Sequence, residues 1–592
     1  MRRAAVLVGA MILAACTGRA ATTTTTATVP ATTSASQPTT TVPTTTTSGP
    51  STTTTTTMAP PAEHRIQARV VDGKGEFYDT ATGERFVPRG MNYNRFLTAR
   101  DGSTVDLLLS TNAYDPATVD EDLAAMRSMG FNVVRVMLET CGVHINGCIT
   151  GADGRLNPAY MDNVVDFLRR VKAHDMFVMV SSNTLPDDGY WINATARLAN
   201  ETFASANNEF LNPKAVPIYV DYWRSVVQAL VDRAAPLDVI WGYELRQEHY
   251  FHLDYAPLSL DEGLITTANG ETYDMASRDD KNRMVDEGLT YWADLIRTAI
   301  REIDPTALVT VGFFTPNAPN PVRGPGATRF VRTAYFLRNS TMDFFDLHHY
   351  PGNGVDDADV WENFGIASVD EKPIVLGELG AYYSWFSDAA GAAAAIMRMQ
   401  VESCEVGFQG WLVWSWRGDN FTDIWWASDG DAEIARVVSP AERPDPCAYR
   451  TFDFIRWNVA LDATATASSA YPSTPAGYVN DGTPAHWNAT GRAPQWVELA
   501  LAQPTDIETI RLVVAQDPPG ASVHELWIRR SGGNLERVHV FDGTTAEGDI
   551  LTYEPPEPLT AVELVRVVTK RLAGGLAPAW HEIELLTRSN PD

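Results

Sequence analysis

The chain has 592 residues, which is too many for one hydrophobic core, so two or more folded domains are expected. Hydrophobic residues make up 44% of the sequence and 16 residues are tryptophan, a composition of folded domains rather than of a disordered chain. Because 46 Lys and Arg residues stand against 74 Asp and Glu residues, the net charge is −28, which argues against nucleic acid as a partner.

The first residues have the pattern of an export signal. Two arginines follow Met1 and precede the apolar run AAVLVGAMILAAC, which is too short to span a membrane. Residues 13–16, LAAC, resemble a bacterial lipobox, in which the cysteine is acylated and becomes the mature N-terminus. We therefore expect a lipoprotein signal peptide over residues 1–16 and an exported protein anchored at the cell surface through Cys16. The alternative is cleavage nearby and release as a secreted protein.

Residues 17–62 consist almost entirely of Thr, Ala, Ser and Pro. Such a segment has little apolar surface to bury and cannot offset the entropy that ordering would cost. We expect a disordered stalk of the O-glycosylated kind. As a flexible coil it would hold the folded domains about 35–40 Å from the membrane.

Residues 63–450 alternate short apolar strands with amphipathic helical segments. The segment from Asp115 to Gly130 has an N-cap aspartate, a proline in the first turn and a glycine at the stop, the boundary signals of a helix. Near-continuous apolar strands indicate burial on both faces, as in a parallel sheet. Eight such units predict an α/β protein with a (β/α)₈ TIM barrel. The expected strands are FVPRGMNY, NVVRVML, MFVMVSS, VIWGYEL, ALVTVGFF, FFDLHHY, PIVLGEL and GWLVWSW.

A doubly wound open sheet is the rival architecture for this region. It is disfavoured because no Gly-rich phosphate-binding loop follows the first strand. The barrel is therefore the fold that the sequence predicts.

Two glutamates end expected barrel strands, where the functional residues of such barrels lie. Glu248 ends the fourth strand and Glu378 the seventh, and these strands lie on roughly opposite sides of an eight-stranded ring. Two facing carboxylates are what hydrolysis of a glycosidic bond requires, with a separation of about 5–5.5 Å where configuration is retained. Glu244 is the rival on the fourth strand, but it lies deeper, and we expect it to pair with Arg246 as a structural residue.

Several strand motifs resemble those of glycoside hydrolase family 5, the cellulase and mannanase family of clan A, over roughly residues 70–440. They are FVPRGMNYN, GFNVVRVML, DLHHYP, VLGELG and GWLVWSW. The resemblance implies a retaining β-glycoside hydrolase with Glu248 as acid/base, Glu378 as nucleophile and no catalytic cofactor. Its implied substrate is a polysaccharide or oligosaccharide of the β-mannan or β-glucan class. The residues that would bind substrate or support the site are Asn92, Arg135, Gln247, His348, Tyr350, Trp414 and Trp416.

Some of these supporting roles have a physical reason of their own. Tyr350 can donate a hydrogen bond to an ionised Glu378, and Arg135 would keep that carboxyl group charged. His348 has the same strand parity as Tyr350 and is expected to face the barrel mouth, whereas His349 is assigned to packing. A metal site built from the two adjacent histidines is disfavoured for the same reason.

The eighth strand and Gln247 bear on the substrate. Sugar rings stack on indoles, so one of Trp414 and Trp416 is expected to be exposed at the rim. The sequence WSWRGDN resembles the corresponding part of some mannanases and favours β-mannan over β-glucan. Gln247 stands where the family usually has asparagine, one methylene shorter. This departure motivates the alternative of a non-hydrolytic surface carbohydrate-binding protein.

Residues 451–592 change to short alternating strands separated by Gly and Pro turns, which predicts an all-β sandwich. NDGTPAHWNA, PQWVELAL and WHEIELL resemble the discoidin fold (F5/8 type C, a galactose-binding-like jelly roll) over about residues 455–588. The resemblance implies glycan binding and a structural calcium near Asp481 and Glu582. The alternative is a packing module alone. A scaffold or adhesion protein would rest on the stalk and this module only.

Four cysteines remain after Cys16. In an exported protein an even set favours disulfides. CGVHINGC closes a short loop, so we expect Cys141 to pair with Cys148, which leaves Cys404 with Cys447. Zinc is disfavoured because the two close cysteines lack a second clustered pair. We expect the protein to act as a monomer on a carbohydrate substrate.

Overall fold

The computed structural model describes most of the chain after residue 62. The described residues are 63–98, 104–138, 147–186, 189–316, 328–351, 357–383, 386, 388–417, 424–428, 432–448, 457–481 and 485–587. The described residues all belong to one compact unit, which spans residues 62–592. The expected signal peptide, stalk and Cys16 lie outside them. Within the described part of the chain, no helix is long and apolar enough to cross a membrane.

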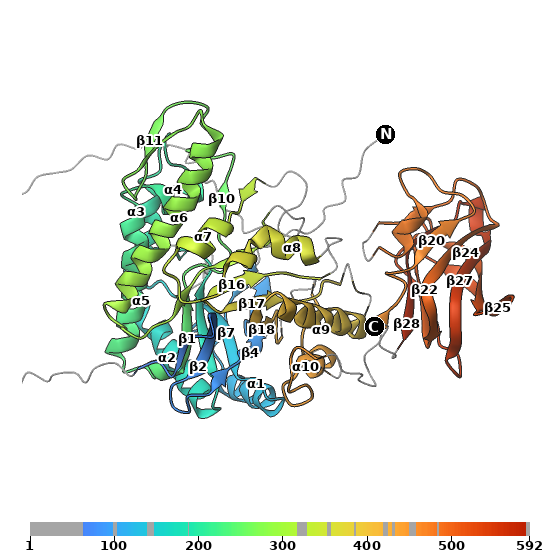
Figure 1. Ribbon diagram of the computed structural model, residues 1–592, viewed down its shortest axis with the longest axis horizontal. Coiled ribbons are helices and arrows are strands. Elements are labelled where there is room, and N and C mark those ends of the chain that lie inside the picture. Colours follow the sequence, from blue (N-terminus) through green and yellow to red (C-terminus); the bar gives the residue numbers. More distant parts are fainter. Residues whose placement is uncertain are drawn as a thin grey trace, which may run out of the picture. The chain divides into compact units, whose positions relative to one another are not determined.

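Parallel strands form the predicted TIM barrel (Figure 1). Their order in the sheet is β13-β9-β8-β7-β4-β18-β17-β16-β14. Strand β13 pairs with β9, and β14, which follows it after a single residue, pairs with β16, so the fifth expected strand joins the two ends of the sheet. The barrel strands are β4 (Arg89–Asn92), β7 (Val133–Leu138), β8 (Phe177–Ser182), β9 (Ile240–Glu244), β13 (Val309–Thr310), β14 (Gly312–Phe314), β16 (Phe345–His348), β17 (Ile374–Leu379) and β18 (Phe408–Val413).

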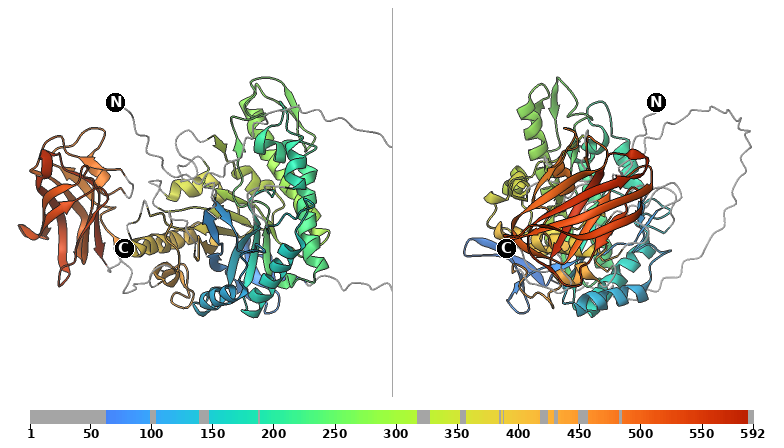
Figure 2. Two further views of the ribbon diagram at one scale, coloured as in Figure 1. Left: turned by 180° about the vertical axis from the view of Figure 1, so that it is seen from behind. Right: turned by 90° about the vertical axis from the view of Figure 1, so that its right-hand side faces the viewer.

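Helices lie outside the barrel strands (Figure 2), which explains why strands such as β7, β8 and β17 are buried along their whole length. Helix α1 begins as predicted, with Asp115 accepting a hydrogen bond from the Ala117 amide and Pro116 in the first turn. The helices are α1 (Pro116–Ser128), α2 (Pro158–Ala173), α3 (Tyr190–Ala196), α4 (Ser205–Leu211), α5 (Val216–Asp232), α6 (Arg278–Arg301), α7 (Ala334–Asn339), α8 (Asp357–Phe364), α9 (Ala389–Glu405) and α10 (Glu433–Val438).

A small antiparallel sheet packs against the N-terminal end of the barrel. It consists of β1 (Ile66–Val71), β2 (Lys74–Asp79) and β3 (Arg85–Phe86). The Phe77 ring lies 5.2 Å from the Trp241 ring and 5.3 Å from the Phe344 ring, and both partners stand at or just before the start of a barrel strand. This aromatic cluster fills the N-terminal end of the barrel, and the polar side chains stand at the opposite, C-terminal end.

Long connections follow the C-terminal ends of several barrel strands. Strand β10 (Phe251–His252) pairs with β15 (Arg329–Phe330), and β11 (Leu264–Thr266) pairs with β12 (Thr272–Asp274). Strand β5 (Phe96–Thr98) pairs with β6 (Thr104–Asp106) after the first barrel strand. These hairpins and bridges add backbone around the end of the barrel where the polar residues stand.

The C-terminal module has the predicted β-sandwich architecture, with two antiparallel sheets around a core of its own. One sheet has the order β19-β28-β23-β26, with β21 also paired to β28, and the other has the order β20-β22-β27-β24-β25. Trp487 and Trp580 are fully buried between them. The strands are β19 (Trp457–Asn458), β20 (Thr464–Ala467), β21 (Trp487–Asn488), β22 (Gln495–Ile507), β23 (Thr509–Val514), β24 (Gly520–Arg530), β25 (Leu535–Thr545), β26 (Ile550–Tyr553), β27 (Leu559–Leu572) and β28 (Ala579–Thr587).

Cys404 at the end of α9 forms a disulfide with Cys447, at a Cα–Cα distance of 5.8 Å. Cys148 is also disulfide-bonded, while Cys141, its expected partner, lies outside the described residues. The first of these bonds ties the segment after α10 back to the barrel helix that precedes the eighth strand.

We predict that replacing both Cys404 and Cys447 by serine lowers the stability of the barrel by about 2–4 kcal/mol, because the bond spans 43 residues and restricts the unfolded chain. Thermal and urea unfolding of wild type and variant measure this difference. An unchanged barrel transition would show that the bond contributes nothing to stability.

Candidate active site

The two glutamates expected to face each other do so. Glu378 lies on β17, and Glu248 follows four residues after the end of β9. One oxygen of each carboxyl group and a ring nitrogen of His348 all lie within 4.8 Å of one another. His348 ends β16, and its Nδ1 atom is 3.1 Å from Glu248 Oε1 and 3.4 Å from Glu378 Oε2. Three separate strands thus bring two carboxyl groups and one imidazole together.

Glu378 is held by a donor at each oxygen. Arg135 Nη1 donates to Oε1 at 2.7 Å, and the Tyr350 hydroxyl donates to Oε2 at 2.8 Å. Burial, together with the charge of Glu248, raises the pKa of Glu378 above its ordinary value, while the charges of His348 and Arg135 and the Tyr350 hydrogen bond limit this rise. These contacts favour the ionised carboxylate in a place where burial alone would protonate it.

Glu248 is the more accessible of the two carboxyl groups. Its side chain is 16% exposed, against 6% for the side chain of Glu378. The neighbouring Arg246 donates to the backbone oxygen of Glu248 at 3.2 Å, so this arginine fixes the backbone rather than pairing with the carboxylate. Among the described side chains, His348 is the hydrogen-bond partner of the Glu248 carboxyl group, which is also accessible to solvent.

Asn92 and Gln247 contact protein groups. The Asn92 side chain is fully buried, accepts from Arg135 Nη1 at 2.6 Å and donates to the Gly377 carbonyl at 2.8 Å. Asn92 therefore helps to hold the Arg135 side chain in its orientation. Gln247 donates from Nε2 to Asn183 Oδ1 at 3.0 Å, while its backbone amide donates to the Ser182 carbonyl. Its side chain is thus directed toward the end of β8.

Neither tryptophan of the eighth strand is exposed, contrary to the expectation of one indole open at the rim. Trp414 and Trp416 are each only 4% exposed. Trp416 Nε1 donates to Asp122 of α1 at 2.9 Å, so a buried carboxylate holds this indole in the barrel core. That carboxylate belongs to helix α1, which is far from Trp416 in the sequence. The sequence around Trp416 therefore could not predict this contact.

Glu244 has a different partner from the one expected. Its Oε2 atom accepts from Arg135 Nε at 2.9 Å, across the barrel interior from β9 to β7. Arg246 instead lies over the rings of Phe210 and Tyr250, at 5.0 and 5.1 Å. The expected pairing of Glu244 with Arg246 is therefore wrong, because the partner of Glu244 comes from the second barrel strand rather than from its own.

Two residues near the carboxyl groups were not anticipated. Asp346 is fully buried on β16, with Oδ1 3.6 Å from His348 Nε2. Tyr382 follows β17, and its ring lies 5.3 Å from the ring of Tyr350. The strand parity that Asp346 shares with His348 was the available signal for the first. For Tyr382, a position shortly after Glu378 was the only hint.

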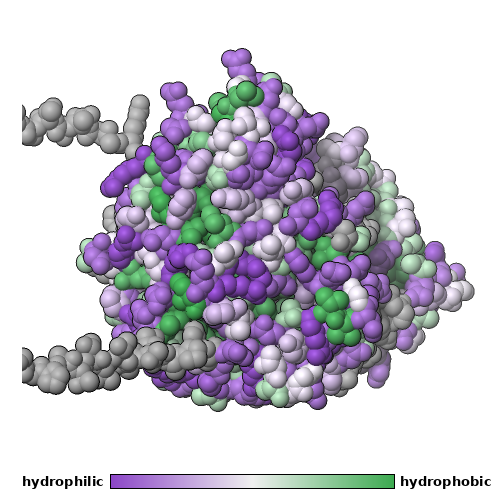
Figure 3. Space-filling model, turned by 60° about the vertical axis from the view of Figure 1, so that its left-hand side comes forward, coloured by the Kyte–Doolittle hydropathy of each residue, from purple (hydrophilic) through white to green (hydrophobic). Residues whose placement is uncertain are grey.

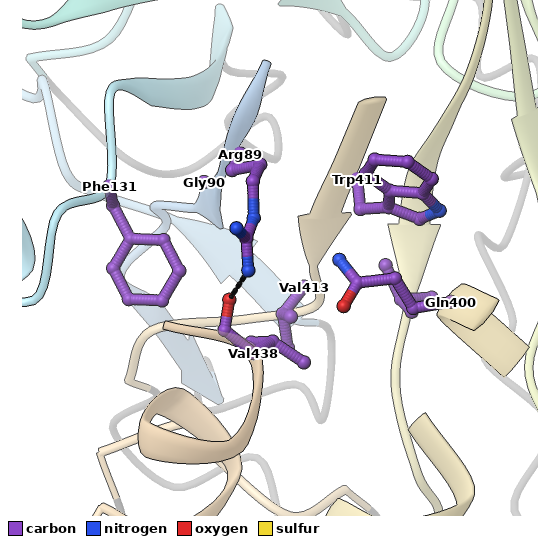
Figure 4. A pocket seen from close by; sticks show the side chains of 8 residues that line it. Arg89, Gly90, Phe131, Gln400, Trp411, Val413 and Val438 are labelled. Atoms are coloured by element: carbon purple, nitrogen blue, oxygen red, sulfur yellow. Dashed lines mark hydrogen bonds between the residues drawn. The ribbon is translucent and has the colours of Figure 1, made fainter. Parts of the chain in front are cut away.

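A second enclosed region lies lower in the barrel, between β4, β18, α9 and α10 (Figure 4). The Arg89 guanidinium occupies it and donates to the carbonyls of Val438 and Arg443. Burial lowers the pKa of Arg89 to about 9. The region is packed by the protein's own side chains and has no carboxylate pair, so it is not a candidate for chemistry.

The proposed calcium ligands lie on neighbouring elements of the C-terminal module. Glu582 on β28 is 8% exposed, and Asp481 follows the short helix η3 (Ala476–Val479), which packs against that strand. Two oxygen donors on adjacent elements fit the chemistry of a calcium site. The groups of three or more carboxylates and histidines found in the described residues lie in the barrel and include neither residue. The calcium site therefore stays a prediction.

No protein-family model and no curated protein matches the chain. Among solved structures, an endo-1,4-β-mannanase from Rhizomucor miehei is 16% identical with a TM-score of 0.44, over 64% of this chain and 99% of that one. An exo-β-1,4-mannosidase from Opitutaceae bacterium strain TAV5 is 18% identical with a TM-score of 0.40; the match covers 64% of this chain and 64% of the mannosidase. A family 32 CBM from C. perfringens in complex with galactose is 19% identical with a TM-score of 0.20, over 22% of this chain and 100% of that one. These likenesses concern the fold.

We predict that Arg135→Leu lowers the free energy of unfolding by about 3–5 kcal/mol at neutral pH, because it leaves buried carboxylates without their cation. In the variant the folded-state pKa of these groups lies above the unfolded value, so the deficit grows as pH rises and shrinks toward acidic pH. Urea unfolding at neutral and acidic pH measures it.

Arg127→Leu is the matched control for this prediction. Arg127 pairs with Asp175 at 2.8 Å, but both side chains are exposed, so the expected loss is below about 1 kcal/mol. An equal loss in both variants would contradict the role of Arg135 as the buried counter-charge.

Proposed function

We propose that the protein is a retaining β-glycoside hydrolase. The observation that carries the proposal is the approach of Glu248 and Glu378, with oxygens within 4.8 Å at the C-terminal end of a barrel. Retaining glycosidases have carboxyl groups about 5–5.5 Å apart, whereas inverting enzymes need roughly 6.5–9.5 Å to admit a water molecule between carboxylate and sugar. The short separation supports the retaining mechanism.

In this mechanism the two glutamates have different tasks. Ionised Glu378 attacks the anomeric carbon, while Glu248 donates its proton to the leaving glycosidic oxygen, which gives a covalent glycosyl-enzyme. Glu248 then takes a proton from water, which displaces Glu378. The greater exposure of Glu248 suits a group that must reach both the leaving group and water. Tyr350 and Arg135 support Glu378 as the leaving carboxylate of the second step.

For the substrate we propose a β-1,4-linked mannan or its oligosaccharides. The support is the resemblance of residues 414–420, WSWRGDN, to the corresponding part of mannanases. Gln247 places an amide beside Glu248 that can swing from Asn183 to a sugar hydroxyl. The chemistry uses side chains alone, so we propose no catalytic cofactor.

For the setting of this activity we propose an exported, cell-surface monomer. The support is the sequence LAAC at residues 13–16, the Thr- and Pro-rich residues 17–62 and the sandwich over residues 451–592. Hydrophilic residues dominate the face in Figure 3, where hydrophobic ones form small separate patches, as suits a protein that meets water and glycan. The sandwich would bind polysaccharide and keep it near the barrel, or it would only orient the barrel.

We predict that Glu378→Ala abolishes hydrolysis of β-mannan and of aryl β-mannosides alike, because both need the nucleophile. Glu248→Ala lowers kcat on mannan by about 10²–10⁴-fold. The same variant slows the first step much less on an aryl mannoside with an acidic leaving group, because that group departs without protonation. Reducing-sugar release measures hydrolysis of β-mannan, and phenol release measures hydrolysis of the aryl β-mannoside.

The control is Glu271→Gln, an exposed glutamate in the β11–β12 turn, which should match wild type. Equal turnover by wild type and Glu378→Ala would overturn the proposal. Binding of mannan without turnover by the wild type would instead favour the non-hydrolytic carbohydrate-binding alternative.

We predict that Tyr350→Phe moves the acid limb of kcat/KM to higher pH by about one to two units. The phenol hydrogen bond lowers the pKa of Glu378, so its loss raises that pKa, and more alkaline pH is then needed to ionise the nucleophile. Tyr291→Phe, which changes an exposed tyrosine on α6, should leave the limb in place. A shift toward lower pH would contradict the assignment.

A further inference from the structure

A second pair of carboxyl groups lies deeper in the barrel than the first. Glu244 on β9 and Asp346 on β16 are both fully buried, and one oxygen of each lies within 4.8 Å of the other and of a His348 ring nitrogen. His348 thus stands between two acidic pairs, with Nδ1 toward Glu248 and Glu378 and Nε2 toward Asp346 and Glu244. Neither Glu244 nor Asp346 has a place in the mechanism described above.

The barrel wall is shaped to admit this deeper pair. A Cβ atom at Gly312 on β14 would lie 2.3 Å from Glu244 Oε1, and one at Gly377 on β17 would lie 2.0 Å from Asp346 Oδ1. Either contact is closer than atoms can pack. Two strands therefore lack side chains where the two carboxyl groups stand, which makes the pair a built feature of the fold.

The charges around the deeper pair do not balance if every acid is ionised. Arg135 Nε is 2.9 Å from Glu244 Oε2 and 4.0 Å from Asp346 Oδ2, while His348 Nε2 is 3.9 Å from Glu244 Oε1 and 3.6 Å from Asp346 Oδ1. The same two cations also face Glu378, and His348 faces Glu248. Ser181 and Tyr350 add only hydroxyl donors. Four carboxylates would exceed two cations in a buried site, which is costly.

One shared proton removes this excess from the deeper pair. Glu244 Oε2 accepts from Arg135 Nε and from the Ser181 hydroxyl, while Oε1 accepts from none of the described donors. Oε1 is therefore the atom free to carry a proton. Neither oxygen of Asp346 accepts a hydrogen bond of ordinary geometry from the described residues, so Asp346 offers an acceptor for it.

We propose that Glu244 and Asp346 are positioning residues that share one proton, with Glu244 as the neutral donor and Asp346 as the ionised acceptor. Ionised Asp346 then keeps His348 doubly protonated, so that the Nδ1–H group points between Glu248 and Glu378. The effect of the pair on turnover rests on the proposed glycosidase function, whereas the location of the proton does not.

The electrostatics of the three groups agree with this assignment. Burial raises the pKa of Glu244 well above its ordinary value, against the opposing charge of Arg135. For Asp346 burial acts in the same direction, but the charge and hydrogen bonding of His348, the charge of Arg135 and hydrogen bonding from Glu244 together outweigh it, so the pKa is lowered. Burial opposes the charge on His348, yet Glu378 and Asp346 raise its pKa well above the ordinary value.

The test uses the full-length protein and two conservative variants. Glu244→Gln keeps a donor in place of the carboxylic acid, whereas Asp346→Asn removes the negative charge beside His348. Nitrogen NMR of ¹⁵N-histidine-labelled protein, with the His348 signal assigned through His348→Asn, reports the charge of the ring. We expect His348 to stay doubly protonated at mildly alkaline pH in wild type and Glu244→Gln, and to become neutral in Asp346→Asn.

Infrared spectroscopy locates the proton independently of the NMR measurement. A protonated-carboxyl band at neutral pH should move when glutamate carboxyls are ¹³C-labelled and should stay when aspartate carboxyls are labelled. Glu244→Gln should remove one component of it. A band that moves with aspartate labelling, or a His348 that loses its charge in Glu244→Gln or keeps it in Asp346→Asn, would overturn the proposal.

A kinetic readout separates positioning from mere support of the fold. In Asp346→Asn the neutral His348 no longer favours ionised Glu378, so the acid limb of kcat/KM moves to higher pH, whereas in Glu244→Gln the midpoints stay where they are in wild type. If no glycan is hydrolysed at all, the proposed function fails, while the NMR and infrared outcomes still decide where the proton lies.

Discussion

The structure depends on one buried guanidinium. Arg135 comes from the second barrel strand and bonds to Asn92 on the first, Glu244 on the fourth and Glu378 on the seventh. A charge in the interior is costly unless it is paired and hydrogen-bonded. Loss of any one of these contacts would leave a buried polar or charged group without a partner. The same side chain that joins four strands also fixes the oxygen of the proposed nucleophile. The stability of the barrel and the proposed chemistry therefore depend on the same contacts.

The barrel can hold such a charged layer because its two ends are built differently. The N-terminal end is filled by apolar and aromatic side chains, with Phe77 of the small sheet packed on Trp241 and Phe344. Apolar packing there supplies stability without polar constraints. The charged layer lies at the other end, and buried ion pairs are often no more stabilising than hydrophobic residues of similar volume. The charged layer is therefore better accounted for by the proposed site than by the stability of the fold.

The sequence predicted the parts of the structure that follow from local pattern, and missed those set by contacts across the barrel. Apolar runs and helix caps located all eight barrel strands and the start of α1, and strand ends identified Glu248 and Glu378 as neighbours. Strand parity shows which way a side chain points but not what it meets. It could not show that Glu244 meets Arg135 or that Trp416 meets Asp122, because each partner comes from a distant element.

Gln247 shows how a local departure can be absorbed by its surroundings. The longer side chain reaches Asn183 at the end of β8, and the backbone carbonyl of Gln247 approaches Gly312 so closely that a Cβ there would lie 1.9 Å away. The backbone at this position is therefore confined, and the extra methylene must be taken up by the side chain. An amide held by Asn183 can exchange this hydrogen bond for one to another polar group at little net cost. Under the proposed glycosidase function, that exchange would favour a sugar whose hydroxyl projects toward β8, so the unusual glutamine would affect selectivity rather than remove the chemistry.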